Sequence, residues 1–95
     1  MMKFDYEWND RVMTVTHREV TALEAVRIDM RSVRPDGATP TLEEKYLLAL
    51  DICRDYIEDI DGEKPDFTKM PAMLPIVLAA KLKRLGLFGA QPEND

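Results

Sequence analysis

Apolar and polar residues alternate at the start of the chain, over residues 3–16. This period of two is typical of half-buried strands, and the dipeptide Asn9-Asp10 in its middle tolerates the positive φ of a tight turn. A two-residue turn would place one set of side chains on a single face: Phe4, Tyr6, Trp8, Met13 and Val15. The sequence therefore predicts a β-hairpin whose apolar face covers a helix or a partner, because an isolated hairpin is only marginally stable.

A helical period replaces this alternation after Thr16. Thr16 and Glu19 have the spacing of a capping box, in which the hydroxyl and the carboxylate each accept a backbone N–H of the first turn. Ile28 is expected to point away from the core, and the helix is expected to end before Pro35. The predicted core-facing stripe of this helix is formed by Val20, Leu23, Val26 and Met30.

The most regular helical pattern lies over residues 41–60. Its start has two solutions: Thr39 as cap with Pro40 in the first turn, or Thr41 as cap with Glu44 three residues later. Gly62 is expected to be the left-handed residue that ends this helix. One continuous stripe predicts the core face: Leu42, Tyr46, Ala49, Leu50, Cys53, Tyr56, Ile57 and Ile60.

Some residues of this second helix predict a contact surface. Leu47, Leu48 and Ile52 do not fit the core stripe and indicate a second apolar flank, available to a partner or to a homodimer. The acidic side chains lie roughly opposite the stripe. Together with two apolar residues near the end of the chain, the expected partner-binding residues are Leu47, Leu48, Ile52, Asp55, Asp59, Leu87 and Phe88.

A third helix is expected to begin near Leu74, because a proline such as Pro75 is tolerated only in the first turn. Gly86 fits the position after the helix, as in a Schellman motif. Residues 89–95 are predicted to be a disordered tail, and residues 1–88 a single domain. The predicted fold is therefore α+β and mostly helical, with the N-terminal hairpin packed on a three-helix bundle.

The charge of the chain is negative and uneven, which limits the classes of partner. The formal charge is −5, and residues 39–68 contain nine acidic and three basic residues. This distribution argues against binding of nucleic acid or anionic lipid and permits a basic protein partner. Residues 1–8 lack the apolar core of a signal peptide, and the uncharged segment 70–80 is too short to cross a bilayer. A cytoplasmic location is expected.

The residues that most often carry chemistry are few. Cys53 is the single cysteine and lies on the core stripe, so we interpret it as a small buried hydrophobe, and no disulfide can form within the chain. His17 is the single histidine and is expected to be exposed in a first helical turn. Arg27, Arg31 and Arg34 form a basic stripe that is expected to pair with acidic residues of the second helix, although a phosphate-contacting face is the other interpretation.

An acidic run follows the second helix and could suggest calcium, but its spacing does not fit. An EF-hand loop with Gly62 at its sixth position would begin at Ile57, which offers no side-chain oxygen. We therefore interpret the run as a solvated acidic face. No metal, cofactor or catalytic residue is expected, and the chain is predicted not to be an enzyme. The run consists of Asp55, Glu58, Asp59, Asp61, Glu63 and Asp66.

Three sequence segments resemble a known family. Thr41-Leu-Glu-Glu leads to Ile57-Glu-Asp-Ile-Asp-Gly-Glu, and a closing helix ends in Leu82-Lys-Arg-Leu. This order is similar to that of small tail-assembly chaperones of tailed bacteriophages, over about half the chain. The resemblance implies a non-enzymatic protein that holds tail subunits soluble during virion assembly in a phage or prophage. It assigns no functional residue.

The sequence thus predicts a small protein that acts by binding another protein, as an adaptor or assembly chaperone. The alternative is an acidic regulator that masks a basic, nucleic-acid-binding surface on a partner enzyme. Salt separates the two hypotheses, because Coulombic masking weakens steeply with ionic strength while apolar contact does not.

Overall fold

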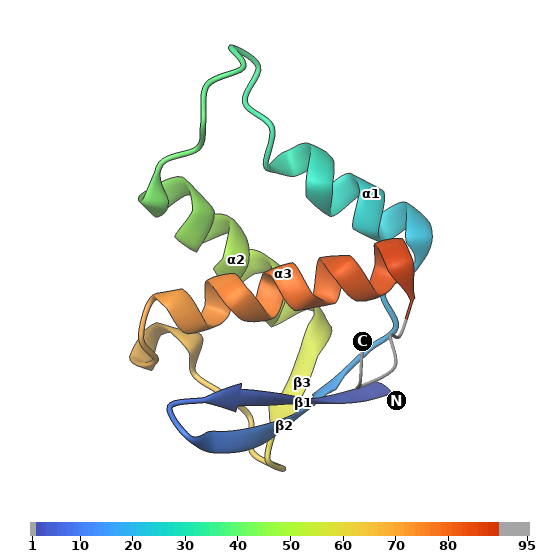
Figure 1. The fold of residues 1–95 in the computed structure, drawn as a ribbon, viewed down its shortest axis with the longest axis vertical. Coiled ribbons are helices and arrows are strands. Elements are labelled where there is room, and N and C mark those ends of the chain that lie inside the picture. The colour runs from blue at the N-terminus through green and yellow to red at the C-terminus, as the bar shows by residue number, and fades with distance from the viewer. Residues whose placement is uncertain (1, 90–95) are drawn as a thin grey trace.

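Residues 2–89, which the computed structural model describes, have an α+β fold with one antiparallel sheet and three α-helices (Figure 1). Helical residues make up half of these residues, so the predicted fold class is confirmed in its coarse form. The elements follow in the order β1 (Met2–Trp8), β2 (Arg11–His17), α1 (Ala22–Arg31), α2 (Leu42–Tyr56), β3 (Ile57–Ile60), the short 3-10 helix η1 (Phe67–Lys69) and α3 (Met73–Phe88).

The N-terminal hairpin has the predicted register. Tyr6 is paired with Met13 and Trp8 with Arg11, on either side of a two-residue turn. Asn9 and Asp10 have φ values of 50° and 64°. Both values are positive, as the tight primed turns of hairpins require, and asparagine and aspartate tolerate them better than most residues do.

A third strand, β3, lies where the sequence predicted the last turn of the second helix. Helix α2 ends at Tyr56, and residues Ile57–Ile60 pair with β2 instead. Their two isoleucines favour extended backbone, and β2 offers an open edge that pairing satisfies. Asp61 and Gly62 then adopt positive φ in the turn after β3, so the prediction that Gly62 ends a helix was wrong.

The start of the first helix was also predicted wrongly. Thr16 is buried within β2, and the capping box is formed five residues later by Thr21 and Glu24. The same Thr-x-x-Glu spacing occurs at both places in the sequence, and pairing of β3 with β2 keeps Thr16 in a strand. At α2, Thr41 and Glu44 form the capping box, which confirms the second of the two predicted starts.

Helix α3 begins one residue before the predicted start and ends later than predicted. Gly86 lies inside the helix, and Gly89, with a φ of 78°, occupies the C-cap position. Gly86 is needed for contact and not for a turn. A Cβ atom there would lie 2.5 Å from the Cβ of Ala25 and 2.9 Å from a methyl of Val20. Its missing side chain lets α1 approach α3 closely. Residues 90–95 of the predicted tail lie outside the described residues.

The three helices lie on one side of the sheet. In Figure 1, α3 crosses between the sheet and the other two helices, and α1 and α2 run in opposite directions, joined by the long loop at the top. Both α1 and α2 pack on α3 and make little direct contact with each other, so the predicted three-helix bundle is only partly formed. Residues of the sheet, α2 and α3 meet in the core, whose most deeply buried side chains include Val15, Cys53, Leu78 and Leu82.

Candidate functional site

Helix α1 carries an apolar face that points away from the core. Its buried face is formed by the small side chain of Ala25 and by Ile28, the residue that the sequence analysis placed on the outside. On a helix, residues at 23, 26 and 30 project opposite this pair. The outward residues define what we call the α1 stripe, with their exposed fractions: Leu23 59%, Val26 44%, Met30 68% and, just beyond the helix, Val33 66%.

The sequence analysis predicted Leu23, Val26 and Met30 to face the core, and this prediction was wrong. The reason lies in how α1 meets α3. The close approach at Gly86 requires a small residue on the contacting face of α1, and Ala25 supplies it. The larger apolar residues therefore remain on the opposite side. A soluble helix usually presents charged residues there, so the α1 stripe is an unusual surface feature.

Ion pairs lie along the sides of α1. Arg31 pairs with Asp51 at 3.8 Å and Arg34 with Glu44 at 3.1 Å, which confirms that part of the basic stripe faces acidic residues of α2. On the other side, the Nζ of Lys83 lies 3.1 Å from a carboxylate oxygen of Asp29. Arg27 places an exposed positive charge beside the α1 stripe, without an ion-pair partner among the described residues.

The predicted second flank of α2 is divided between surface and core. Leu47 is 53% exposed, whereas Ile52 is only 3% exposed. The expectation that Ile52 lies on an exposed flank is therefore corrected: α2 ends against β3 and α3, and Ile52 packs in the core there. Leu48 is half-buried, so its exposure lies between those of Leu47 and Ile52.

The other predicted contact residues are dispersed. Asp55 is exposed near the end of α2, where its backbone carbonyl accepts a hydrogen bond from the Nε of Arg18. Asp59 is half-buried in β3 and its carboxylate accepts the N–H of Gly62. Leu87 and Phe88 are exposed in the last turn of α3. The structure therefore does not gather these residues into one surface with Leu47.

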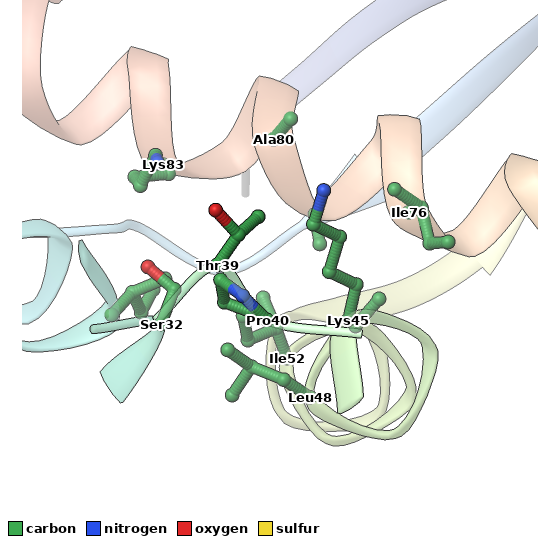
Figure 2. A pocket seen from close by; sticks show the side chains of 12 residues that line it. Ser32, Thr39, Pro40, Lys45, Leu48, Ile52, Ile76, Ala80 and Lys83 are labelled. Atoms are coloured by element: carbon green, nitrogen blue, oxygen red, sulfur yellow. The ribbon is translucent and has the colours of Figure 1, made fainter. Parts of the chain in front are cut away.

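A groove opens between α1, α2 and α3 (Figure 2). Its volume is about 410 Å³, within the range of ligand pockets. Leu48 and Ile52 of α2 and Ile76 of α3 form part of its apolar wall, and Lys45 and Lys83 supply its charge. No acidic side chain is among its lining residues. The groove is wide open to solvent, which favours an extended macromolecular contact over an enclosed small molecule.

A polar cluster beside the core joins the segment that follows β2 to α1 and α2. Tyr56 Oη donates to Glu24 Oε2 at 2.6 Å, and Arg18 pairs with the same oxygen at 3.1 Å while its guanidinium lies 4.0 Å above the Tyr56 ring. The hydrogen bond from Tyr56 is the main reason that the pKa of Glu24 is lowered to about 2. Burial, followed by the bond to Glu24, raises the pKa of Tyr56. Each of these three side chains has an interaction partner within the cluster, so we interpret the cluster as structural.

His17 and Cys53 are both buried. His17 is 1% exposed at the end of β2, where Nδ1 lies 2.8 Å from the carbonyl oxygen of Arg18 and the ring packs on Phe4. The prediction of an exposed histidine in a helix was wrong, because β2 extends through this residue. Burial of Cys53 is confirmed, and it raises the pKa of the thiol to about 12. Neither side chain lines the groove.

The acidic run is spread over the end of α2, β3 and the segment that follows. Some of its carboxylates accept hydrogen bonds from backbone N–H groups. Asp61 Oδ1 accepts the N–H of Thr14 at 2.9 Å, and Asp66 accepts the N–H of Thr68. Among residues 2–89 no group of three histidine, cysteine or acidic side chains is placed to hold a metal ion. In the same part of the chain, no helix combines the length and apolarity needed to cross a membrane.

Comparison with known proteins found no protein-family model, no curated protein and no solved structure that matches this chain.

Proposed function

We propose that this chain is a non-enzymatic protein-binding module, an adaptor or assembly chaperone, and that the α1 stripe is its main contact surface. The observation that carries the proposal is the outward orientation of Leu23, Val26 and Met30, opposite the buried face of α1. Covering these side chains with an apolar partner surface would remove them from water, which is the main favourable term in protein association. Apolar helix faces are a common means of recognition between proteins.

The charge beside the stripe favours a partner other than a second α1 helix. In an antiparallel pair of α1 helices related by a two-fold axis, the same side of each helix faces its own copy. Arg27 would then lie beside Arg27 of the other copy, and like charges in contact are unfavourable. A partner helix with an apolar face and an acidic residue beside it would instead pair with Arg27. We therefore propose such an amphipathic, acid-flanked helix as the partner.

The assembly-chaperone part of the proposal rests on the resemblance to phage tail-assembly chaperones. A protein of that kind would cover apolar segments of structural subunits until they assemble. The exposed residues Leu87 and Phe88, at the end of α3 that contacts α1, would then extend the apolar contact beyond the α1 stripe. The acidic-regulator alternative receives less support, because Glu44 and Asp51 already pair with arginines of the same chain.

The experiment compares matched variants in capture of partners from the native source. Val26→Glu and Met30→Glu place a charge within the stripe, and Leu47→Glu places the same charge on an exposed leucine of α2 as a control. Each immobilised variant is washed at low and high salt, and bound proteins are quantified by mass spectrometry after circular dichroism has verified the fold. We expect one or more proteins retained by the wild type and Leu47→Glu at high salt and lost from both stripe variants.

Two outcomes would contradict the proposal. Bound proteins that are retained equally by the wild type and both stripe variants would show that another surface makes the contact. Bound proteins that are lost from every variant and from the wild type at high salt would favour the acidic regulator, because such contacts are Coulombic. A captured protein is then tested as a purified pair by calorimetry, where binding to an apolar face should give a negative heat-capacity change.

A further inference from the structure

Strand β1 forms an open edge of the sheet. Within residues 2–89 the strand order is β1-β2-β3, and β1 pairs with β2 alone, over seven residues. Unpaired strand edges present a row of backbone donors and acceptors to which another strand can bind. Among the described elements, β2 is the one with extensive contact to β1, so the helices do not cover this edge.

The outward backbone groups of β1 follow from the hairpin register. Asp5 is opposite Thr14, whose N–H and C=O are both bonded to Asp61 on the β3 side. Thr14 therefore does not exchange backbone bonds with Asp5, and in an antiparallel ladder such pairs alternate with bonded ones. The N–H and C=O groups of Lys3, Asp5 and Glu7 consequently point to the open edge, where no strand of the described part of the chain pairs with them.

The charges along this edge are complementary to a reversed copy of themselves. If β1 pairs antiparallel with β1 of a second chain, with Asp5 at the two-fold axis, Lys3 of each copy lies opposite Glu7 of the other. Opposite charges in directly facing strand positions are favourable, and this register supplies two such pairs. It also brings together residues whose backbone groups point outward, as the ladder requires.

The one like-charged pair in this register is Asp5 with its own copy. The structure already directs this carboxylate inward, because Asp5 Oδ1 accepts a hydrogen bond from Thr14 Oγ1 at 2.9 Å. The side chain is therefore held over β2 and away from the open edge. This geometry reduces the repulsion between the two aspartates at the axis.

The opposite face of β1 supplies apolar pairs in the same register. Phe4 of one copy would face Tyr6 of the other, and Met2 would face Trp8. The three aromatic side chains pack against the core but remain half-buried, and Met2 is 44% exposed. Aromatic cross-strand pairs stabilise sheets, and pairing would cover the apolar area that the core leaves exposed.

Registers shifted by two residues are less favourable. A shift in one direction places Glu7 opposite Asp5 twice, which sets like charges against each other. A shift in the other direction pairs Lys3 with Asp5 but leaves Trp8 beyond the end of the overlap. We propose that two copies of this chain associate through antiparallel pairing of their β1 strands, with Lys3 opposite Glu7, to form one continuous six-stranded sheet. This association is independent of the α1 stripe.

The test is a charge swap measured by sedimentation equilibrium of the purified full chain. Lys3→Glu and Glu7→Lys each replace two attractive pairs by two repulsive ones, so each should raise the dimer dissociation constant by about tenfold or more. The double variant, Lys3→Glu with Glu7→Lys, restores both pairs and should return the constant to within about threefold of the wild type. Asp5→Asn should tighten the dimer, because it removes the repulsion at the axis.

The matched controls make the same charge changes elsewhere. Lys64→Glu and Glu63→Lys lie in the segment after β3 and should leave the dissociation constant unchanged. Within one chain, Lys3 faces Thr16 and Glu7 faces Val12, so the swap breaks no ion pair inside the hairpin. A wild-type chain that remains monomeric at several hundred micromolar would overturn the proposal. A double variant as weak as Lys3→Glu, with Glu7→Lys unchanged from the wild type, would overturn it as well, since that result fits the register in which Lys3 faces Asp5 and Glu7 has no charged partner.

Discussion

Helices α1 and α2 both begin with a Thr-x-x-Glu capping box, and both carry a wide apolar stripe in the sequence. In α2 most of the predicted stripe is buried, because β3 and α3 pack against this helix. In α1 the predicted stripe residues Leu23, Val26 and Met30 face solvent, whereas Val20, just before the helix, and a smaller face centred on Ala25 are buried. The comparison teaches that the apolar period of a helix identifies its apolar residues, while the shape of the neighbouring helix decides which of them it can bury.

The largest effect is expected when a leucine is shortened to alanine in each of the two helices. Leu50→Ala removes a buried side chain of α2 and should lower the free energy of unfolding by about 2–5 kcal/mol, through lost burial and the remaining cavity. Leu23→Ala on the α1 stripe should change it by less than about 0.5 kcal/mol, as exposed positions do. Urea denaturation of the two variants measures the difference. Equal losses would mean that the α1 stripe is buried.

The next test concerns the contact that orients α1. Gly86→Val would place a Cβ close to Ala25 and its methyls against Val20, so it should lower the free energy of unfolding by about 2 kcal/mol or more. Ala80→Val makes a similar addition at an exposed position of the same helix and should change it by less than about 0.5 kcal/mol. A stable Gly86→Val variant would show that the close approach of α1 and α3 is not required.

A smaller effect is expected at the two helix starts. Thr21→Ala and Thr41→Ala each remove the hydroxyl of a capping box and should each lower the free energy of unfolding by about 1 kcal/mol. Thr39→Ala tests the alternative start of α2 and should have no measurable effect. If Thr39→Ala lowered the free energy of unfolding as much as Thr41→Ala, the result would place the start of α2 at Thr39.

The last test uses pH, and its magnitude is limited by the solvent exposure of the groups. The pKa of Glu24 falls from an ordinary value of 4.5 to about 2 in the folded chain, mainly through the bond from Tyr56. A group with a lowered folded pKa contributes stability that is present above its unfolded pKa and is lost as pH falls toward its folded pKa. The free energy of unfolding should therefore decrease as the pH falls from about 4.5 to about 2. Glu24→Gln should make this decrease smaller.

Two controls sharpen that test. Glu44 occupies the equivalent position in α2 and also has a lowered pKa, through its bonds to Thr41, but it has no tyrosine partner. Glu44→Gln should therefore change the pH dependence less than Glu24→Gln does. Glu19→Gln replaces the residue that the sequence pattern placed in the first capping box, and it controls for the change of net charge without removing a bond of the Thr21–Glu24 capping box. Acid titration of the unfolding midpoint distinguishes the three variants, and identical profiles would contradict the role of Tyr56.

Much of the local structure was predictable from the sequence, because it depends on neighbours in the chain. The alternation of Phe4, Tyr6 and Trp8 with charged residues, and the turn at Asn9-Asp10, predicted the hairpin and its register. Thr41 and Glu44 predicted the start of α2. In the candidate site, the sequence predicted that Leu47, Leu87 and Phe88 would be exposed, and it predicted that Arg31 and Arg34 would pair with α2.

Strand alternation, turn residues, capping boxes and apolar periods could be recognised in the sequence alone, because each depends on interactions between residues a few positions apart. Where two such signals compete, contacts between distant parts of the chain select one of them. Pairing with β2 made Ile57–Ile60 a strand and placed Thr16 in a sheet, and contact at Gly86 turned the α1 stripe outward. These outcomes depend on the free energy of contacts between residues that are distant in the chain, which no local pattern contains.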